Sequence, residues 1–286
     1  MVAKRILALF LVVLMICSLF TACKKEKEQQ KVEQFMNATI EETVIYDDDN
    51  VTASIVSLNW LDNDGLDILF RINDKNNLGL SFDIGERLNI NGAMMVATRG
   101  QSSDGSLLYY TISEDDINMC GIKNIYMISM DSISIYNRTD EEYIVENVKF
   151  EIKTDMYDDA VFAKETGDRV FESSKAIVYY TKASWGTISA SPVLCIKNKS
   201  TETLSLAIIK VSIDGNEPDV PTISTGFALP GTLYYINVVD YLQSDCGIDL
   251  SNAKTITLKL GVIETATGKI EYTHDNYVIQ LQENVI

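Results

Sequence analysis

Residues 107–112 read LLYYTI and residues 232–237 read TLYYIN, an offset of 125 positions. Each segment is followed by the same tripeptide, Cys-Gly-Ile, at 120–122 and at 246–248. A hydrophobic, tyrosine-rich stretch followed by a polar turn that ends in Cys-Gly-Ile therefore occurs twice. This pair decides the fold, because it indicates that the chain holds two copies of one structural unit.

Other segments repeat in the same order at nearly the same distance. They are SIVSLNW with YYTKASW (54–60 and 179–185), LDILFRINDKNNLGLSF with SPVLCIKNKSTETLSLA (66–82 and 191–207), LNING with VSIDG (88–92 and 211–215) and, upstream, VIYDDDNVTASI with RVFESSKAIVYY (44–55 and 169–180). Collinear matches at one offset predict a tandem duplication. We place repeat 1 at residues 40–154, a linker at 155–167 and repeat 2 at 168–286.

Each copy has the pattern of short β-strands. The stretch NVTASIVSL (50–58) alternates apolar and polar residues with a period near two, as a half-buried strand does. Asn-Gly at 91–92 and Asp-Gly at 214–215 predict type I′ hairpin turns, which need positive φ at both central residues. We therefore expect an all-β protein of two tandem immunoglobulin-like β-sandwich domains, without the antibody-type cysteine and tryptophan signature.

One short helical turn is expected in each copy, just before Cys-Gly-Ile. In the first, Ser113 is a candidate N-cap with Asp116 three residues on, and Gly121 is a candidate C′ residue. In the second, Asp240 is the candidate cap with Gln243 three residues on.

The N-terminus has the layout of an export signal. A short cationic stretch, MVAKR (1–5), precedes a continuous apolar run, ILALFLVVLMICSLF (6–20), which is short for a membrane-spanning helix but typical of a signal peptide. The run ends in LFTAC (19–23), which resembles a bacterial lipobox. This resemblance implies a signal peptide at 1–22, cleavage between Ala22 and Cys23, and lipid attachment, palmitate included, at Cys23. An ordinary secretory signal and an uncleaved anchor remain alternatives.

Residues 23–39 are interpreted as a lipid-anchored charged tether. The stretch KKEKEQQKVEQ (24–34) has no apolar period and is dense in charge. Fully extended, such a segment lifts a domain by up to ~60 Å. We expect the protein at the extracytoplasmic face of a bacterial cell membrane.

The order of motifs in both copies also resembles a repeat of uncharacterised lipoproteins from Gram-positive, clostridia-like bacteria. The matching order is strand, Ile-Asn-Gly or Ile-Asp-Gly turn, Leu-Tyr-Tyr strand and a capped turn ending in Cys-Gly-Ile. The family has no assigned activity, so the resemblance implies fold and location only.

The charge of the chain restricts its partners. The net charge is −17 and the sequence pI is near 4.4, so phosphate backbones and anionic lipid surfaces repel the protein. We expect no nucleic-acid partner and membrane contact only through the N-terminal lipid. A protein or glycan partner at the cell surface remains open.

Catalytic and metal-binding patterns are sparse. The chain has one histidine, His274, and no paired Cys-x-x-Cys spacing, which argues against a nucleophilic triad and against zinc. We expect no enzyme activity and no cofactor; an acid-based hydrolase is the alternative that the 41 acidic residues leave open. A weak calcium candidate is formed by Asp62, Asp64 and Asp67 in LDNDGLD, where a plain hairpin turn is the alternative.

Two side-chain roles follow from the Leu-Tyr-Tyr strands and the Cys-Gly-Ile turns. Neighbouring strand residues point to opposite faces, so one tyrosine of each pair is expected in the core and the other, Tyr109 or Tyr234, at the surface as an aromatic contact. Cys120 and Cys246 hold equivalent places and are expected to pack as small buried side chains.

Two functions fit this organisation. The first is a lipid-anchored, non-catalytic surface module for binding, adhesion or structure, with an unknown ligand. The alternative is a carbohydrate- or solute-binding component that works beside a transporter or hydrolase.

Overall fold

The structure is a computed structural model that describes residues 38–61, 65–85, 87–160, 163–185, 188–218 and 223–281. Within this part of the chain no helix is long and apolar enough to cross a membrane. The expected signal peptide and most of the tether, with Ala22 and Cys23, lie outside the described residues, as do Asp62 and Asp64 of the calcium candidate.

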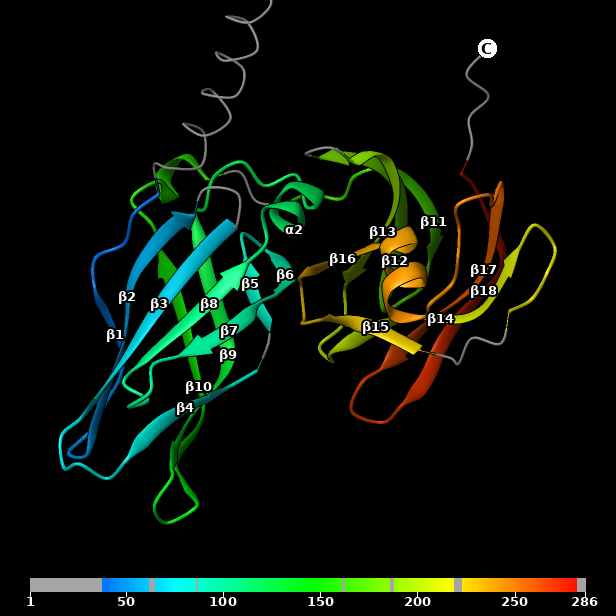
Figure 1. The fold of residues 1–286 in the computed structure, drawn as a ribbon. Coiled ribbons are helices and arrows are strands. Elements are labelled where there is room, and N and C mark those ends of the chain that lie inside the picture. Colours follow the sequence, from blue (N-terminus) through cyan, green and yellow to red (C-terminus); the bar gives the residue numbers. More distant parts are fainter. Residues whose placement is uncertain are drawn as a thin grey trace, which may run out of the picture.

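The protein is all-β, as expected, with open sheets (Figure 1). The elements of the N-terminal half are β1 (Thr43–Asp47), β2 (Val51–Leu61), β3 (Gly65–Asp74), β4 (Leu80–Ile84), β5 (Arg87–Ile90), β6 (Ala93–Val96), β7 (Thr98–Gln101), β8 (Leu107–Ile112), α2 (Glu114–Met119), β9 (Met127–Asn137) and β10 (Glu142–Lys153).

A single 3₁₀ turn, η1 (Tyr157–Asp159), lies in the segment between the halves as the structure describes it. The elements of the C-terminal half are β11 (Asp168–Glu172), β12 (Ala176–Trp185), β13 (Ile188–Asn198), β14 (Leu204–Ile213), β15 (Ile223–Ala228), β16 (Leu233–Asn237), α3 (Val238–Asp240), the π-helical turn η2 (Tyr241–Asp245), β17 (Thr255–Glu264) and β18 (Lys269–Gln280).

Most strand pairings recur in both halves. In the N-terminal half the order β1-β2-β3-β8-β7 forms one sheet, and β10-β9-β5-β6, with β4 also on β9, belongs to another. In the C-terminal half β11-β12-β13-β16 corresponds to β1-β2-β3-β8, and β14-β17-β18 corresponds to the β4/β5-β9-β10 group.

The halves are joined by one direct strand pairing, between β6 and β16 (Figure 1). The two strands run parallel, with Leu233 opposite Ala93 and Tyr234 opposite Met94, and the Leu233 amide donates to the Gly92 carbonyl at 2.9 Å. Among the described residues this pairing makes one continuous nine-stranded sheet out of strands from both halves.

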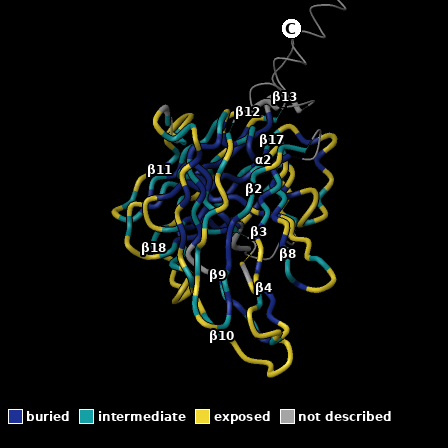
Figure 2. The backbone as a smooth tube through the Cα atoms, turned by 90° about the vertical axis from the view of Figure 1, so that its left-hand side faces the viewer, coloured by how far each residue is buried: buried dark blue, intermediate teal, exposed yellow. Residues whose placement is uncertain are grey.

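Two hydrophobic cores lie on either side of this pairing, and each takes side chains from both halves. Leu233 and Tyr235 of β16 belong to the N-terminal core, whereas Met94 of β6 belongs to the C-terminal core. Buried positions occupy the interior strands in Figure 2, and exposed positions gather at the hairpin tips below β10 and β4. The junction is therefore packed as a protein interior is.

The register of β16 corrects the expectation for Tyr234. In the C-terminal half Tyr234 pairs with Ile196, and in the N-terminal half Leu108 pairs with Phe70. These two pairs are equivalent, so β16 is offset from β8 by 126 residues and not by 125. A one-residue shift turns every side chain of a strand to the other face. Tyr109 is 37 % exposed as expected, but Tyr234 is only 8 % exposed, because it takes the core place of Leu108.

The turn predictions are confirmed at both hairpins, since Asn91, Gly92, Asp214 and Gly215 all have positive φ. Ser113 caps α2, and its hydroxyl accepts from the Asp116 amide.

The cap predicted for the second helical turn is wrong. The side chain of Asn237, not Asp240, accepts from the amide at the third helical position, because the helix begins earlier relative to Cys246 than α2 does relative to Cys120. The π-helical turn η2 accommodates the additional residues.

The register predicts that substitutions of the equivalent tyrosines Tyr235 and Tyr109 change the free energy of unfolding by different amounts. Tyr235 is 3 % exposed in the N-terminal core and donates to the Lys164 carbonyl at 3.0 Å, while its counterpart Tyr109 is exposed. We expect Tyr235→Ala to lower the free energy of unfolding by about 3–5 kcal/mol. Tyr109→Ala should change it by less than about 1 kcal/mol. Urea unfolding followed by circular dichroism measures both, and equal effects would contradict the 126-residue register.

Candidate functional site

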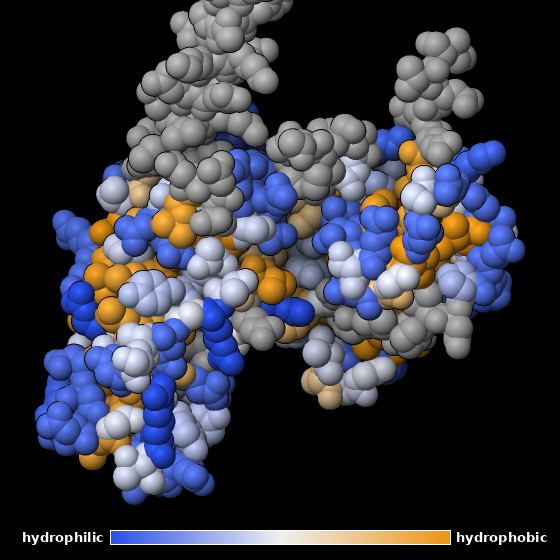
Figure 3. Space-filling model, in the orientation of Figure 1, coloured by the Kyte–Doolittle hydropathy of each residue, from blue (hydrophilic) through white to orange (hydrophobic). Residues whose placement is uncertain are grey.

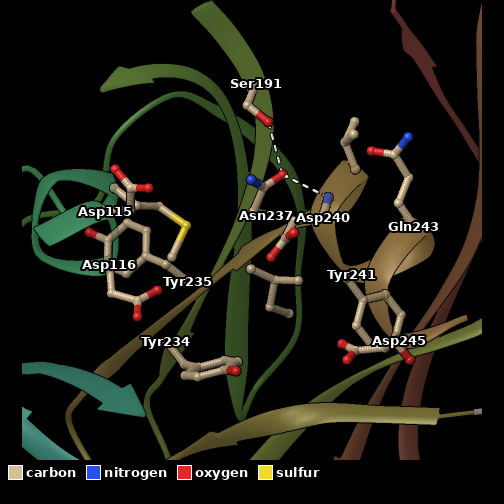
Figure 4. A pocket seen from close by; sticks show the side chains of 13 residues that line it. Asp115, Asp116, Ser191, Tyr234, Tyr235, Asn237, Asp240, Tyr241, Gln243 and Asp245 are labelled. Carbon is tan, nitrogen blue, oxygen red and sulfur yellow. Dashed lines mark hydrogen bonds between the residues drawn. The ribbon is translucent and has the colours of Figure 1, made fainter. Parts of the chain in front are cut away.

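A pocket of about 440 Å³ opens between the two halves, beside the β6–β16 junction (Figure 4). Its walls are the two short helical segments, α2 from the N-terminal half and α3 with η2 from the C-terminal half. Strand β16 lies between these walls, and Ser191 of β13 lies at one end. We call this pocket the interdomain cleft.

Carboxylates line both walls of the interdomain cleft. Asp115 and Asp116 lie on α2, and Asp240 and Asp245 lie on the facing helical segment (Figure 4). Neither lysine nor arginine is among the lining residues that the structure describes. The cleft is therefore an acidic surface between two walls of like charge.

Helix caps bond to the backbone of one aspartate on each wall. On α2, the Ser113 hydroxyl accepts from the Asp116 amide at 3.1 Å and donates to the Asp116 carboxylate at 2.6 Å. On the opposite wall, the Asn237 side-chain oxygen accepts from the Asp240 amide at 3.2 Å and from the Ser191 hydroxyl at 2.8 Å. A cap thus orients one aspartate on each wall.

The electrostatic environment of Asp116 is unfavourable for a carboxylate. Burial raises its pKa above the ordinary value, Asp115 and Asp240 raise it further, and the hydrogen bond from Ser113 opposes these effects. The influence of Asp240 comes from across the cleft. A bound cation would relieve both the repulsion and the loss of solvation.

Tyrosine rings form the floor. Tyr234 lies below the guanidinium of Arg87, 5.7 Å from the ring centroid, and against Gly226 of β15. Gly226 has a φ of +146°, and a side chain there would collide with the Tyr234 ring. Burial is the main cause of the raised pKa of Tyr234, and the cationic Arg87 opposes the rise.

Tyr241 is a further residue in the wall of the cleft. Tyr241 is 8 % exposed, and its buried oxygen has no nitrogen or oxygen partner among the described residues. The Cys246 thiol lies beside it, and burial first and then this thiol raise the pKa of Tyr241. The oxygen is buried and faces this thiol, so Tyr241 contributes its ring to the lining of the cleft and not a hydroxyl that a ligand there reaches.

The spacing of the carboxylates does not suit a metal ion. No group of three or more Asp, Glu, His or Cys side chains in the described residues lies close enough to hold one. Separated carboxylates with aromatic rings between them suit an extended organic cation, because ammonium groups pair with carboxylates and with aromatic faces.

The structure places the sequence-predicted residues apart from one another. Asp67 of the calcium candidate lies on β3, where its carboxylate accepts from the Thr111 hydroxyl. His274 lies on β18 with its ring stacked on Phe171 at 5.6 Å between centroids. Tyr109 lies on the exposed face of β8.

The two Cys-Gly-Ile cysteines differ in burial. Cys120 is buried in the N-terminal core, and burial raises the pKa of its thiol. Cys246 is half-buried beside Tyr241. The expectation that both pack as buried side chains fits Cys120 better than Cys246.

No known protein-family model matches this chain, and no curated protein matches it either. The chemistry of the interdomain cleft is therefore the basis for a functional assignment.

Asp116 makes stability depend on pH in a defined direction. Its folded-state pKa lies above the unfolded value, so the ionised side chain destabilises the folded protein, and this effect is lost as pH falls below the unfolded value. We expect Asp116→Asn to have a higher Tm than the natural protein at pH 7 and the same Tm near pH 3. Thermal unfolding at both pH values measures this, with Asp49→Asn, an exposed aspartate in the turn between β1 and β2, as the control. A Tm difference that is independent of pH would contradict it.

Proposed function

We propose that the protein is a lipid-anchored, extracytoplasmic binding protein built from two immunoglobulin-like β-sandwich domains. In this proposal residues 1–22 are removed, Cys23 carries the lipid, residues 23–39 form the tether, and the domains span 40–154 and 168–286. The recurrence of the β1-β2-β3-β8 order as β11-β12-β13-β16 supports the two-domain division. The lipobox-like LFTAC supports the anchor.

The ligand of this proposal is an organic cation that enters the interdomain cleft. The observation that carries it is the facing pair of aspartates, Asp116 and Asp240, on opposite walls of a cleft whose described lining holds no lysine or arginine. Two like-charged walls repel each other, and a cation of matching length converts that repulsion into attraction from both sides. The protein binds its ligand and performs no chemistry on it.

The cleft also favours the solute-binding alternative over pure adhesion. A concave site between domains, lined by polar and aromatic residues, is the usual setting for a small ligand. A soluble amine and the basic side chain of a peptide share this chemistry, and a titration with each distinguishes them.

Binding of spermidine tests the cleft. We expect saturable binding by calorimetry, with a loss of affinity on the order of tenfold for Asp116→Asn, which is half-buried, and a smaller loss for Asp240→Asn, which is exposed, since each removes a carboxylate that pairs with the cation. Asp49→Asn, an exposed aspartate on another face, is the matched control.

The same titration has a predicted pH dependence. Affinity should fall as pH is lowered through the raised pKa of Asp116, because the protonated carboxyl no longer attracts the cation. A lysine-rich peptide that binds while spermidine does not would assign the cleft to a basic peptide. Binding that is unchanged in both cleft variants would rule out the cleft as the site.

The lipid anchor has its own test. We expect palmitate added to growing cells to label the full-length protein, and Cys23→Ala to abolish the label. Cys17→Ala, a cysteine within the expected signal peptide, should keep it. Labelling that survives Cys23→Ala would contradict the proposed anchor.

A further inference from the structure

Two equivalent strands join different sheets in the two halves. β7 and β15 both lie directly before the Leu-Tyr-Tyr strand of their half. β15 lies antiparallel on β14, with Ile223 opposite Ile208, whereas β7 lies antiparallel on β8, with Thr98 opposite Thr111. One strand has therefore changed sheets between the copies.

The change leaves one backbone edge open in the N-terminal half. β4 corresponds to the part of β14 that pairs with β15. The Phe82–Ile135 pair between β4 and β9 is equivalent to the Ile208–Leu260 pair between β14 and β17. In the described residues β4 pairs with β9 and with no other strand. The edge that holds β15 in the C-terminal half is thus unoccupied here.

A groove of about 500 Å³ lies at this open edge, between β4 and β7. Ser81 to Asp83 form one wall and Arg99 to Gln101 the other, and both walls are edge strands of their sheets. Strongly hydrophilic side chains cover the region of these two strands in Figure 3. The buried Phe82 and Leu108 give the groove an apolar floor beneath its polar walls.

We propose that this groove is a strand-addition site, in which an extended segment of a partner protein lies antiparallel on β4. The supporting observation is within the same chain, because the equivalent edge of β14 already pairs with an antiparallel strand, β15. In strand addition the main-chain hydrogen bonds supply affinity, and pockets for alternate side chains supply specificity.

The floor of the groove determines which side chain fits. In the C-terminal half the ring of Tyr234 lies under β15 and leaves room only for Gly226. In the N-terminal half Leu108 stands in the place of Tyr234, and it is smaller. The partner segment therefore carries an aliphatic side chain at the position that corresponds to Gly226.

The rim offers an aromatic contact as well. Tyr143 is 46 % exposed, packs edge-to-face on Tyr136 with centroids 5.2 Å apart, and donates to Asp83 at 2.5 Å. The ring is thus held in place beside the groove without being covered.

A partner chain fits the groove better than the N-terminal tether does. Thr39 is fixed to Asp155, just beyond the end of β10, by a 2.7 Å hydrogen bond. The groove lies at Tyr143, near the start of β10, and the ten residues from there to Lys153 correspond to about 33 Å, so about ten tether residues would be needed to reach it and only the charged beginning of the tether would remain to pair with β4. The stretch 24–34 is also dense in charge and has no alternating pattern that would suit a strand.

The test uses two peptides with the sequence of residues 222–229, one natural and one carrying Gly226→Leu. We expect full-length protein, purified in detergent, to bind the leucine peptide about tenfold more tightly, because that side chain fills the space above Leu108. Hydrogen exchange should show increased protection of the amides of β4 on binding.

Two variants of the protein complete the test. Leu108→Tyr gives the groove the tyrosine floor of the C-terminal half. It should reverse the preference between the two peptides, so that the glycine peptide binds more tightly. Because a misfolded protein does not gain binding, this result separates the proposal from a loss of folding. Tyr143→Ala removes an exposed rim contact and should weaken the leucine peptide several-fold without a loss of stability.

Three results would overturn the proposal. They are equal binding of the two peptides, binding without protection of β4, and an unchanged preference in Leu108→Tyr. An oligomer of β-linked N-acetylglucosamine is the rival probe, and protection of β4 and β7 by this glycan but by neither peptide would also overturn it.

Discussion

The parallel pairing of β6 with β16 is the contact on which the arrangement of the molecule depends. Because alternate residues of a strand face opposite sides, the pairing sends Leu233 and Tyr235 into the N-terminal core and Met94 into the C-terminal core. The two halves thereby complete each other's interior and cover each other's exposed strand edge.

The duplication predicted the strands and turns well, because these depend on local patterns that both copies retain. The prediction of which sheet face each tyrosine occupies was wrong at Tyr234. Leu-Tyr-Tyr aligns by its letters at an offset of 125, but the hydrogen-bonding register places Tyr234 where Leu108 stands, at 126. Both leucine and tyrosine occur in a protein interior and on a sheet face that another part of the molecule covers. The residue types therefore did not distinguish the 125-residue offset from the 126-residue offset. Only the contacts across the junction determine which tyrosine is covered.

The interdomain cleft could not be predicted from either copy alone. Asp116 and Asp240 each follow a Leu-Tyr-Tyr strand within a short helical segment, and in isolation each is an ordinary surface aspartate of a helix. They become a site because the β6–β16 pairing brings α2 opposite α3 and η2. Burial and the charge of the facing wall then raise the pKa of Asp116, which is an effect of the assembled molecule and not of the local sequence.

The two halves also differ in which sheet the strand before Leu-Tyr-Tyr joins, and this difference has a physical origin in a few side chains. β15 reaches β14 because Gly226 lets its backbone lie against the Tyr234 ring. In the N-terminal half β7 pairs with β8, and the edge of β4 stays open above Leu108. Within the described residues, the edge of β14 thus carries β15, and the corresponding edge of β4 carries no strand. In the proposed strand-addition site, the β14–β15 pairing gives the orientation of the added strand, and Leu108 in the place of Tyr234 is the reason to expect a larger side chain than glycine.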